Sequence, residues 1–119
     1  MIHGSLAHAN AECVVRKVCK TTNFLDRMRG LLGTQKLDVD EGLLITPCSS
    51  VHTFGMQYTI DVLFLDKQLT IVKTVKSLKP WRMAASKSSN MVLELADDSI
   101  NKLHLETGQQ LEWHNDFAI

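Results

Sequence analysis

The sequence predicts a small, mainly β (α+β) domain, built as an antiparallel β-barrel or sandwich with two short flanking helices. Six or seven short stretches are apolar or alternating, carry β-branched and aromatic residues, and are separated by turn residues. Only two stretches have the spacing of a helix. The length of 119 residues, with 45% hydrophobic and 22% charged residues, is ordinary for one globular domain. A parallel sheet of βαβ units would need more helices than two.

The N-terminal third of the chain contains a weak strand pattern followed by a clear helix pattern. Residues 1–11 are small and polar, which predicts a flexible N-terminus over 1–12 and a single compact domain over 13–119. Val14 to Lys20 alternates weakly and is expected to form the first strand. Thr22 can cap a helix that ends at Gly33. The apolar face of this helix is expected to consist of Phe24, Leu25, Met28, Leu31 and Leu32.

The rest of the chain has the shorter period of strands. The turn residues 66–68 predict a hairpin between two strands, and Asp97 can cap a second helix that runs to Leu103. The expected strands are Gly42 to Thr46 before Pro47, Ile60 to Leu65, Leu69 to Val75, Met91 to Leu95 and Gln109 to Trp113.

The net charge of the chain does not favour binding to a polyanion. Thirteen basic and thirteen acidic residues cancel, so we expect neither a nucleic-acid partner nor binding to anionic lipid. Locally, five cations and no carboxylate lie between Lys73 and Lys87. Such a stretch could hold an anion, although a solvated edge strand and loop is the simpler interpretation.

Cysteine usage and hydropathy point to the cytoplasm. The three cysteines, Cys13, Cys19 and Cys48, cannot all pair within one chain, which argues against a disulfide-stapled secreted domain. No run approaches the roughly 20 apolar residues of a membrane span. Residues 1–11 lack the basic start and apolar stretch of a signal peptide. We therefore expect a cytoplasmic protein without a membrane span.

Residues 47–66 contain most of the reactive side chains, and two chemical interpretations of them are possible. Cys48, His52 and Met56 are a soft ligand set suited to copper, but residues four apart on a strand lie about 13 Å from each other, so no metal or other cofactor is predicted. Alternatively, Cys48 could act as a nucleophile with His52 as its base and Asp61 as the orienting acid.

A third, structural interpretation of the same stretch is favoured. His52 and Thr53 would hydrogen-bond to the backbone of a turn, while Phe54 and Met56 pack inward. A carboxylate at Asp61, within an apolar strand, must accept several N–H bonds, and it would hold the preceding loop. This arrangement still allows the loop to line a ligand pocket.

Trp81 follows Pro80 and is flanked by Lys79 and Arg82. An exposed tryptophan beside cations can stack on a sugar, a base or a side chain of a partner. The simpler interpretation is that Trp81 closes one end of the core with Arg82 over its ring.

Several short motifs together resemble one prokaryotic family, domain of unknown function 192 (DUF192). The resemblance extends from about Thr22 to Trp113 and implies a compact, mainly β fold with short helices. It implies no activity and supplies no catalytic residue. The motifs are residues 29–33 (RGLLG), 41–44 (EGLL), 51–56 (VHTFGM), 60–66 (IDVLFLD), 78–82 (LKPWR) and 92–95 (VLEL).

The function remains unknown at this point, and our leading hypothesis is a non-catalytic accessory domain that binds a small ligand or a protein. Its recognition surface would combine the loop from Cys48 to Tyr58 with the corner from Pro80 to Arg82. The expected binding residues are His52, Thr53, Met56, Asp61, Trp81 and Arg82. The alternatives are a thiol-dependent or metal-assisted hydrolase using Cys48, His52 and Asp61, and a structural subunit of a larger assembly.

Overall fold

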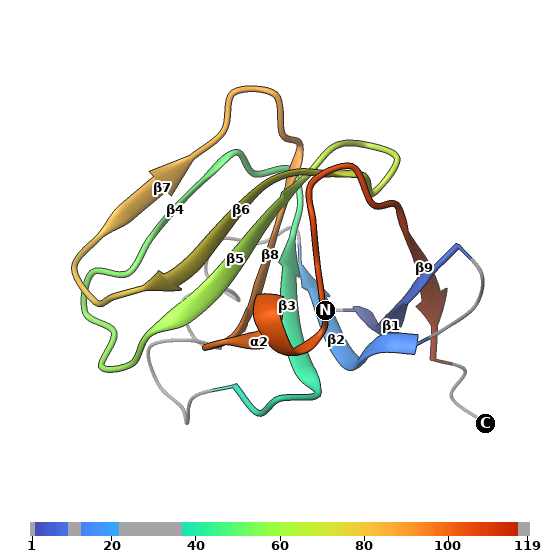
Figure 1. The fold of residues 1–119 in the computed structure, drawn as a ribbon, viewed down its shortest axis with the longest axis horizontal. Coiled ribbons are helices and arrows are strands. Elements are labelled where there is room, and N and C mark those ends of the chain that lie inside the picture. Colours follow the sequence, from blue (N-terminus) through green and yellow to red (C-terminus); the bar gives the residue numbers. More distant parts are fainter. Residues whose placement is uncertain (1, 10–12, 22–36, 117–119) are drawn as a thin grey trace.

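The computed structural model of the chain describes residues 2–9, 13–21 and 37–116. These residues form a mixed seven-stranded sheet and a separate two-stranded sheet (Figure 1). The helix expected between Thr22 and Gly33 lies outside the described residues.

The large sheet has the strand order β6-β5-β8-β3-β2-β1-β9. The small sheet pairs β4 (Ser50–His52) with β7 (Met83–Ala85), and one short helix, α2, covers Ser99–Lys102. The strands of the large sheet are β1 (Ile2–His8), β2 (Cys13–Thr21), β3 (Glu41–Ile45), β5 (Ile60–Leu65), β6 (Ile71–Leu78), β8 (Met91–Ala96) and β9 (Leu111–Asn115).

The mainly β class is confirmed, and the six strand stretches expected from the sequence are all strands. Ile60–Leu65 has the expected ends, and the other five have shifted ends. The expectation of a wholly antiparallel sheet is wrong, because β2 and β3 are parallel. Parallel neighbours need a crossover of a dozen or more residues, and the chain between Thr21 and Glu41 is long enough to supply it. The other neighbours in the large sheet are antiparallel.

The two ends of the large sheet meet at one corner. Thr70, just before β6, forms an isolated antiparallel bridge with Gln110, just before β9. The Ile71 N–H donates to the Gln109 carbonyl at 2.9 Å, and the Leu111 N–H donates to the Leu69 carbonyl at 3.0 Å. Within the described chain, β6 and β9 are joined only through this bridge and its neighbouring bonds, so a closed barrel or a sandwich is not confirmed.

The N-terminal segment corrects the sequence-based expectation of a flexible terminus. Strand β1 pairs with β2 on one side and with β9 on the other. Its Leu6 is fully buried in the larger core cluster, and a Cβ on Gly4 would collide with the Trp113 ring. The partner β9 comes from the other end of the chain, so no local pattern in residues 1–11 could reveal this strand.

Strand β5 is buried on both faces and organises the core. Leu63 and Leu65 belong to the larger apolar cluster, whereas Val62 and Phe64 belong to a second cluster with Val51 of β4. Each such side chain contributes about 1.5–3 kcal/mol when it is fully buried. The small sheet β4–β7 therefore covers one face of β5, and it lies at the opposite end of the molecule from β1 and β9 (Figure 1).

Helix α2 begins differently from the sequence-based expectation. Its N-cap is Asp98, with φ 71° and no side-chain cap bond, so the predicted cap at Asp97 is wrong. Asp97 instead accepts a hydrogen bond from the Ser77 hydroxyl at 2.7 Å. Ile100 of this helix is buried, and Leu103 at its C-terminal end is half-buried. In the described part of the chain, α2 is the one helix observed.

Asp61 supplies the cap that α2 lacks. This side chain is fully buried, its Oδ2 accepts the Ile100 N–H at 2.8 Å, and its Oδ1 accepts the Ser77 N–H at 2.9 Å. The prediction that Asp61 accepts several N–H bonds is therefore confirmed. The predicted target was wrong, because Asp61 holds β6 and α2 and not the loop that precedes β5.

The hairpin expected at residues 66–68 is confirmed. The Asp66 Oδ1 accepts the N–H groups of Gln68 and Thr70 at 2.9 and 3.0 Å. Leu69 adopts φ 64°, which lets the chain turn tightly into the antiparallel pair β5–β6.

Candidate functional site

The small sheet brings together the two segments that stand out in the sequence. Strands β4 and β7 are antiparallel, with Val51 opposite Ala84 and His52 opposite Met83. The loop from Cys48 to Tyr58 and the corner from Pro80 to Arg82 therefore lie side by side (Figure 1). Neither short strand was expected from the sequence, because three residues are too few to show the period of a strand.

Hydrogen bonds of Thr53 hold the two segments together, and we call this set of bonds the Thr53 lock. Its side chain is fully buried, and its hydroxyl donates to the Lys79 carbonyl at 2.6 Å while accepting the Arg82 N–H at 2.9 Å. Its backbone N–H donates to the Arg82 carbonyl at 2.9 Å, and its carbonyl accepts the Trp81 N–H at 3.1 Å. One threonine thus satisfies polar groups on both segments and fixes their relative position.

Two residues beside this lock have left-handed backbone. Gly55 has φ 83°, which glycine adopts without steric cost. Trp81 has φ 63°, a conformation that costs a residue with a Cβ roughly 1–2 kcal/mol. The surrounding hydrogen bonds hold Trp81 in this conformation and direct its ring to the surface.

Three rings form a continuous exposed line, which we name the aromatic row: His52, Phe54 and Trp81. The centroids of His52 and Phe54 are 5.1 Å apart, and those of Phe54 and Trp81 are 5.8 Å apart with nearly parallel planes. Phe54 is 43% exposed, Trp81 64% and the adjacent Met83 68%. Large apolar side chains are therefore concentrated on one exposed surface.

The aromatic row corrects two predictions. Phe54 does not pack inward, and Trp81 does not close the core. The Arg82 guanidinium donates to the Trp81 carbonyl at 3.3 Å, and the Arg82 side chain is exposed. Phe54 lies outside because the alternation along β4 continues past its end and places Val51 and Thr53 inside and His52 and Phe54 outside. Trp81 lies outside because its left-handed backbone directs the ring to the surface.

Met56 and Cys48 lie at the inner side of the loop. The prediction that Met56 packs inward is confirmed, since it is 5% exposed within the second core cluster. Cys48 packs against the same cluster, and its thiol donates to the Ser50 carbonyl at 2.9 Å. The thioether of Met56 and the imidazole of His52 therefore face different environments.

Asp61 and His52 serve different parts of the molecule. The Asp61 carboxylate is directed at the backbone of Ser77 and Ile100, whereas the His52 ring lies at the surface against Phe54. Among the described residues, no three side chains of His, Cys, Asp or Glu are placed to share a metal ion. The geometry does not assemble the Cys48, His52 and Asp61 set of the hydrolase alternative.

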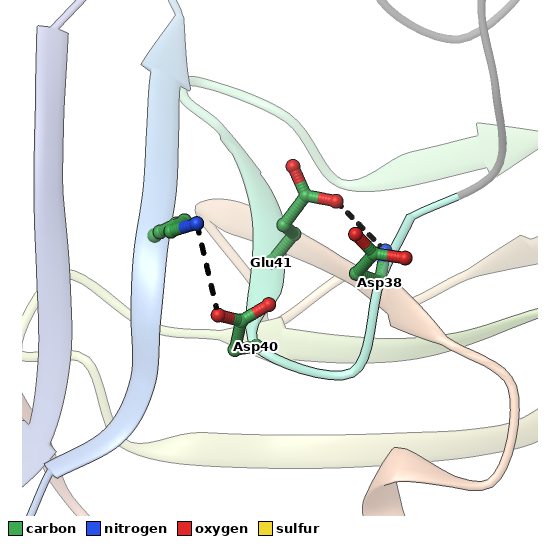
Figure 2. Close-up of polar contacts among 4 residues, drawn as sticks. Asp38, Asp40 and Glu41 are labelled. Atoms are coloured by element: carbon green, nitrogen blue, oxygen red, sulfur yellow. Dashed lines mark hydrogen bonds and ion pairs between the residues drawn. The ribbon is translucent and has the colours of Figure 1, made fainter.

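A second polar group, which no sequence motif indicated, shapes the turn before β3 (Figure 2). The Asp38 N–H donates to Glu41 Oε1 at 2.8 Å, and the Glu41 N–H donates to the Asp38 carbonyl at 3.0 Å. Asp40 lies 4.0 Å from the Lys17 ammonium in an exposed ion pair. The hydrogen bonds between Asp38 and Glu41 stabilise the turn, whereas the exposed ion pair between Asp40 and Lys17 contributes little to stability.

Two shallow cavities flank this turn. One, of about 370 Å³, has Lys17, Cys19 and Glu41 among its described lining residues. The other, of about 450 Å³, has Val39, Tyr58 and Asp97 among them. Burial raises the pKa of the Tyr58 phenol above its ordinary value of 10.0, and the negative charge of Glu94 raises that pKa further. Tyr58 therefore stays neutral and able to donate a hydrogen bond at neutral pH.

Two solved structures share this fold. A proposed transcription regulator from Sinorhizobium meliloti has a TM-score of 0.78 at 20% identity, over 94% of this chain and 92% of that one. A protein of unknown function from Novosphingobium aromaticivorans has a TM-score of 0.73 at 16% identity, over 93% of this chain and 84% of that one. At these identities the likeness concerns the fold alone.

Relatives in sequence are uncharacterised proteins of Thermococcus and Pyrococcus species. A UPF0127 protein of Thermococcus sibiricus is 31% identical over 96 residues, which cover 76% of this chain and 61% of that protein. A UPF0127 protein of Pyrococcus furiosus is 36% identical over 98 residues, which cover 77% of this chain and 82% of that protein. The match thus spans less than two thirds of the Thermococcus protein.

In the part of the chain that the structure describes, no helix has the length and apolar character needed to cross a membrane. The family model described as DUF192, Uncharacterized ACR, matches residues 6–113, which is most of the chain and includes both segments of the candidate site. The chain therefore belongs to the DUF192 family, and the relatives named above have no established activity.

Proposed function

We propose that this domain is a non-catalytic binding module whose recognition surface is the aromatic row together with Met83 and Arg82. The observation that carries the proposal is the lock at Thr53, which fixes two distant segments so that three rings form one exposed surface. In this proposal Thr53 and Met56 support the surface from inside, Asp61 is a core residue apart from it, and the exposed side chains contact the ligand.

The energetics support a binding role for Trp81. Exposing a large ring forgoes the stabilisation of about 1.5–3 kcal/mol that burial would give, and the left-handed backbone of Trp81 adds a further cost. Tryptophan and arginine are enriched among residues that dominate binding energy at interfaces. A preformed surface also loses little conformational freedom when it binds.

A selection experiment tests this proposal even though the ligand is unidentified. A random-peptide phage library is sorted on the immobilised wild-type protein and counter-sorted on the Trp81→Ala variant. We expect enriched peptides to bind the wild type at least tenfold more tightly than Trp81→Ala and Phe54→Ala. Val39→Ala is the matched control, because Val39 is 63% exposed outside the surface, and its affinity should be unchanged.

Circular dichroism of each variant checks that the fold is retained, which we expect because Trp81 and Phe54 are exposed. Equal binding to wild type and to both aromatic variants would show that the aromatic row is not the recognition surface.

We further propose that the scaffold is a partly closed barrel that unfolds as one unit, with β1 included. The bridge between Thr70 and Gln110 supports this view, since it joins the two end strands of the large sheet. The two tryptophans lie at different places, Trp81 beside the small sheet and Trp113 on β9. Urea unfolding followed by the fluorescence of Trp113→Phe and Trp81→Phe variants should give coincident transitions; separate transitions would argue for independent units.

A further inference from the structure

The part of the chain that forms the candidate site contains no carboxylate. Residues 47–60 and 67–93 include β4, β6 and β7, and together they carry six of the thirteen basic residues and none of the thirteen acidic ones. We name this part the basic lobe. The remainder of the chain has seven basic against thirteen acidic residues, so the two parts carry net charges of opposite sign although the net charge of the whole chain is zero.

Several of these cations lie at the aromatic row. Lys79 and Arg82 bracket Trp81, both side chains are exposed, and Thr53 fixes their carbonyl and N–H groups. Lys73 of β6 donates from its ammonium to the Ala85 carbonyl of β7 at 2.8 Å, which places a third cation on the small sheet. Positively charged side chains therefore flank the segments that carry the exposed rings, and the acidic side chains Asp61 and Asp97 reach the lobe at Ser77 of β6.

We propose that the ligand of this surface is a short acidic peptide segment that carries an aromatic or aliphatic anchor residue. This inference rests on the proposed function and names the ligand class of the same site. The aromatic row and Met83 would contact the anchor, while Lys79 and Arg82 pair with flanking carboxylates. The planar guanidinium group of Arg82 can donate two parallel hydrogen bonds to one carboxylate.

Two observations favour a short peptide over a long polyanion. The exposed side chains of Phe54 and Met83 offer apolar contact, which a phosphate backbone does not use. The excess of six acidic residues outside the basic lobe repels any anion that extends beyond it.

The composition of the peptides selected on the wild type against Trp81→Ala tests this inference. We expect enriched sequences with a net negative charge and one apolar anchor. Their affinity, measured by fluorescence anisotropy, should fall at least tenfold in the double variant Lys79→Glu/Arg82→Glu and should weaken with added salt. Lys102→Glu, at an exposed position of helix α2 outside the basic lobe, is the matched control and should leave the affinity unchanged.

The alternatives give distinguishable results. Enriched peptides that need Trp81 but are not acidic, or that bind the Lys79→Glu/Arg82→Glu variant normally, overturn the acidic ligand class and leave the binding surface supported. Failure to enrich any peptide that depends on Trp81 contradicts both proposals. Tighter binding of a single-stranded oligothymidine than of the selected peptides, at the same salt and lost in Trp81→Ala, overturns the peptide class in favour of nucleic acid.

Discussion

Asp61 in the centre of the large sheet and Thr53 at the outer end formed by the small sheet are both fully buried polar side chains, and the two have different consequences. Asp61 joins β5 to β6 and α2, and its partner Ile100 belongs to the core. Thr53 joins two loops, and the side chains next to it in sequence are exposed rings. Asp61 and Thr53 are both buried with satisfied hydrogen bonds, so both have a structural role. They differ in the neighbouring side chains that they hold at the surface, and a function is expected where such side chains are exposed.

The largest effect is expected at the centre. Replacing Asp61 with alanine leaves the N–H groups of Ser77 and Ile100 without their buried acceptor. Two charge-assisted hydrogen bonds are lost, so we expect urea unfolding to show a decrease of about 3–5 kcal/mol in the free energy of unfolding. Asp97→Ala, which removes one exposed acceptor, should cost less than about 1 kcal/mol. A similar cost for the two variants would contradict the capping role of Asp61.

A smaller effect is expected at the lock between the two loops. Thr53→Val keeps the shape of the side chain but removes the hydroxyl that bonds Lys79 and Arg82, which should cost about 1–3 kcal/mol of unfolding free energy. In a Trp113→Phe background the remaining tryptophan fluorescence should change, because Trp81 moves. Thr53→Ser retains the hydroxyl and should keep the wild-type spectrum; an unchanged spectrum in Thr53→Val would refute the lock.

The left-handed backbone of Trp81 predicts whether glycine or alanine gives the more stable variant at this position. At φ 63° glycine is unstrained, so Trp81→Gly should be more stable than Trp81→Ala by about 1 kcal/mol. Met83, on strand β7, should show the opposite order, with alanine more stable than glycine by about 0.5–1 kcal/mol. Thermal unfolding of the four variants measures both differences, and the same order at both positions would mean that Trp81 carries no backbone strain.

The smallest effect concerns Tyr58, which links the loop to the charge of Glu94 on β8. Because burial and Glu94 raise the pKa of Tyr58, the stabilisation from its neutral phenol is complete below pH 10.0 and is lost as the pH rises through the raised value. Tyr58 is the single tyrosine, so tyrosinate absorbance reports its titration alone. We expect a midpoint above 10.0 in the folded protein and a lower one in Glu94→Gln; equal midpoints would exclude an influence of Glu94.

Much of the fold could be predicted where a segment buries its own residues in a regular pattern. Strands such as β5 and β8 are apolar, and the Asp66 turn has its own hydrogen-bonding chemistry. Strand β1 could not be predicted, because its stability depends on partners in β2 and β9. The parallel pairing of β2 with β3 likewise depends on a long-range register that no local pattern encodes.

For the candidate site, as for the fold, some features could be predicted from the sequence and others could not. The sequence by itself determined which two segments hold the reactive and aromatic side chains, that Met56 packs inward and that Asp61 needs N–H partners. Only the tertiary structure decided that Thr53 joins the two segments, that Phe54 and Trp81 face solvent, and that Asp61 belongs to the core away from His52. The physical reason is that the residue type determines whether a side chain needs hydrogen-bond partners or apolar contacts. Pairing between residues distant in sequence determines whether those contacts come from the protein or from the solvent.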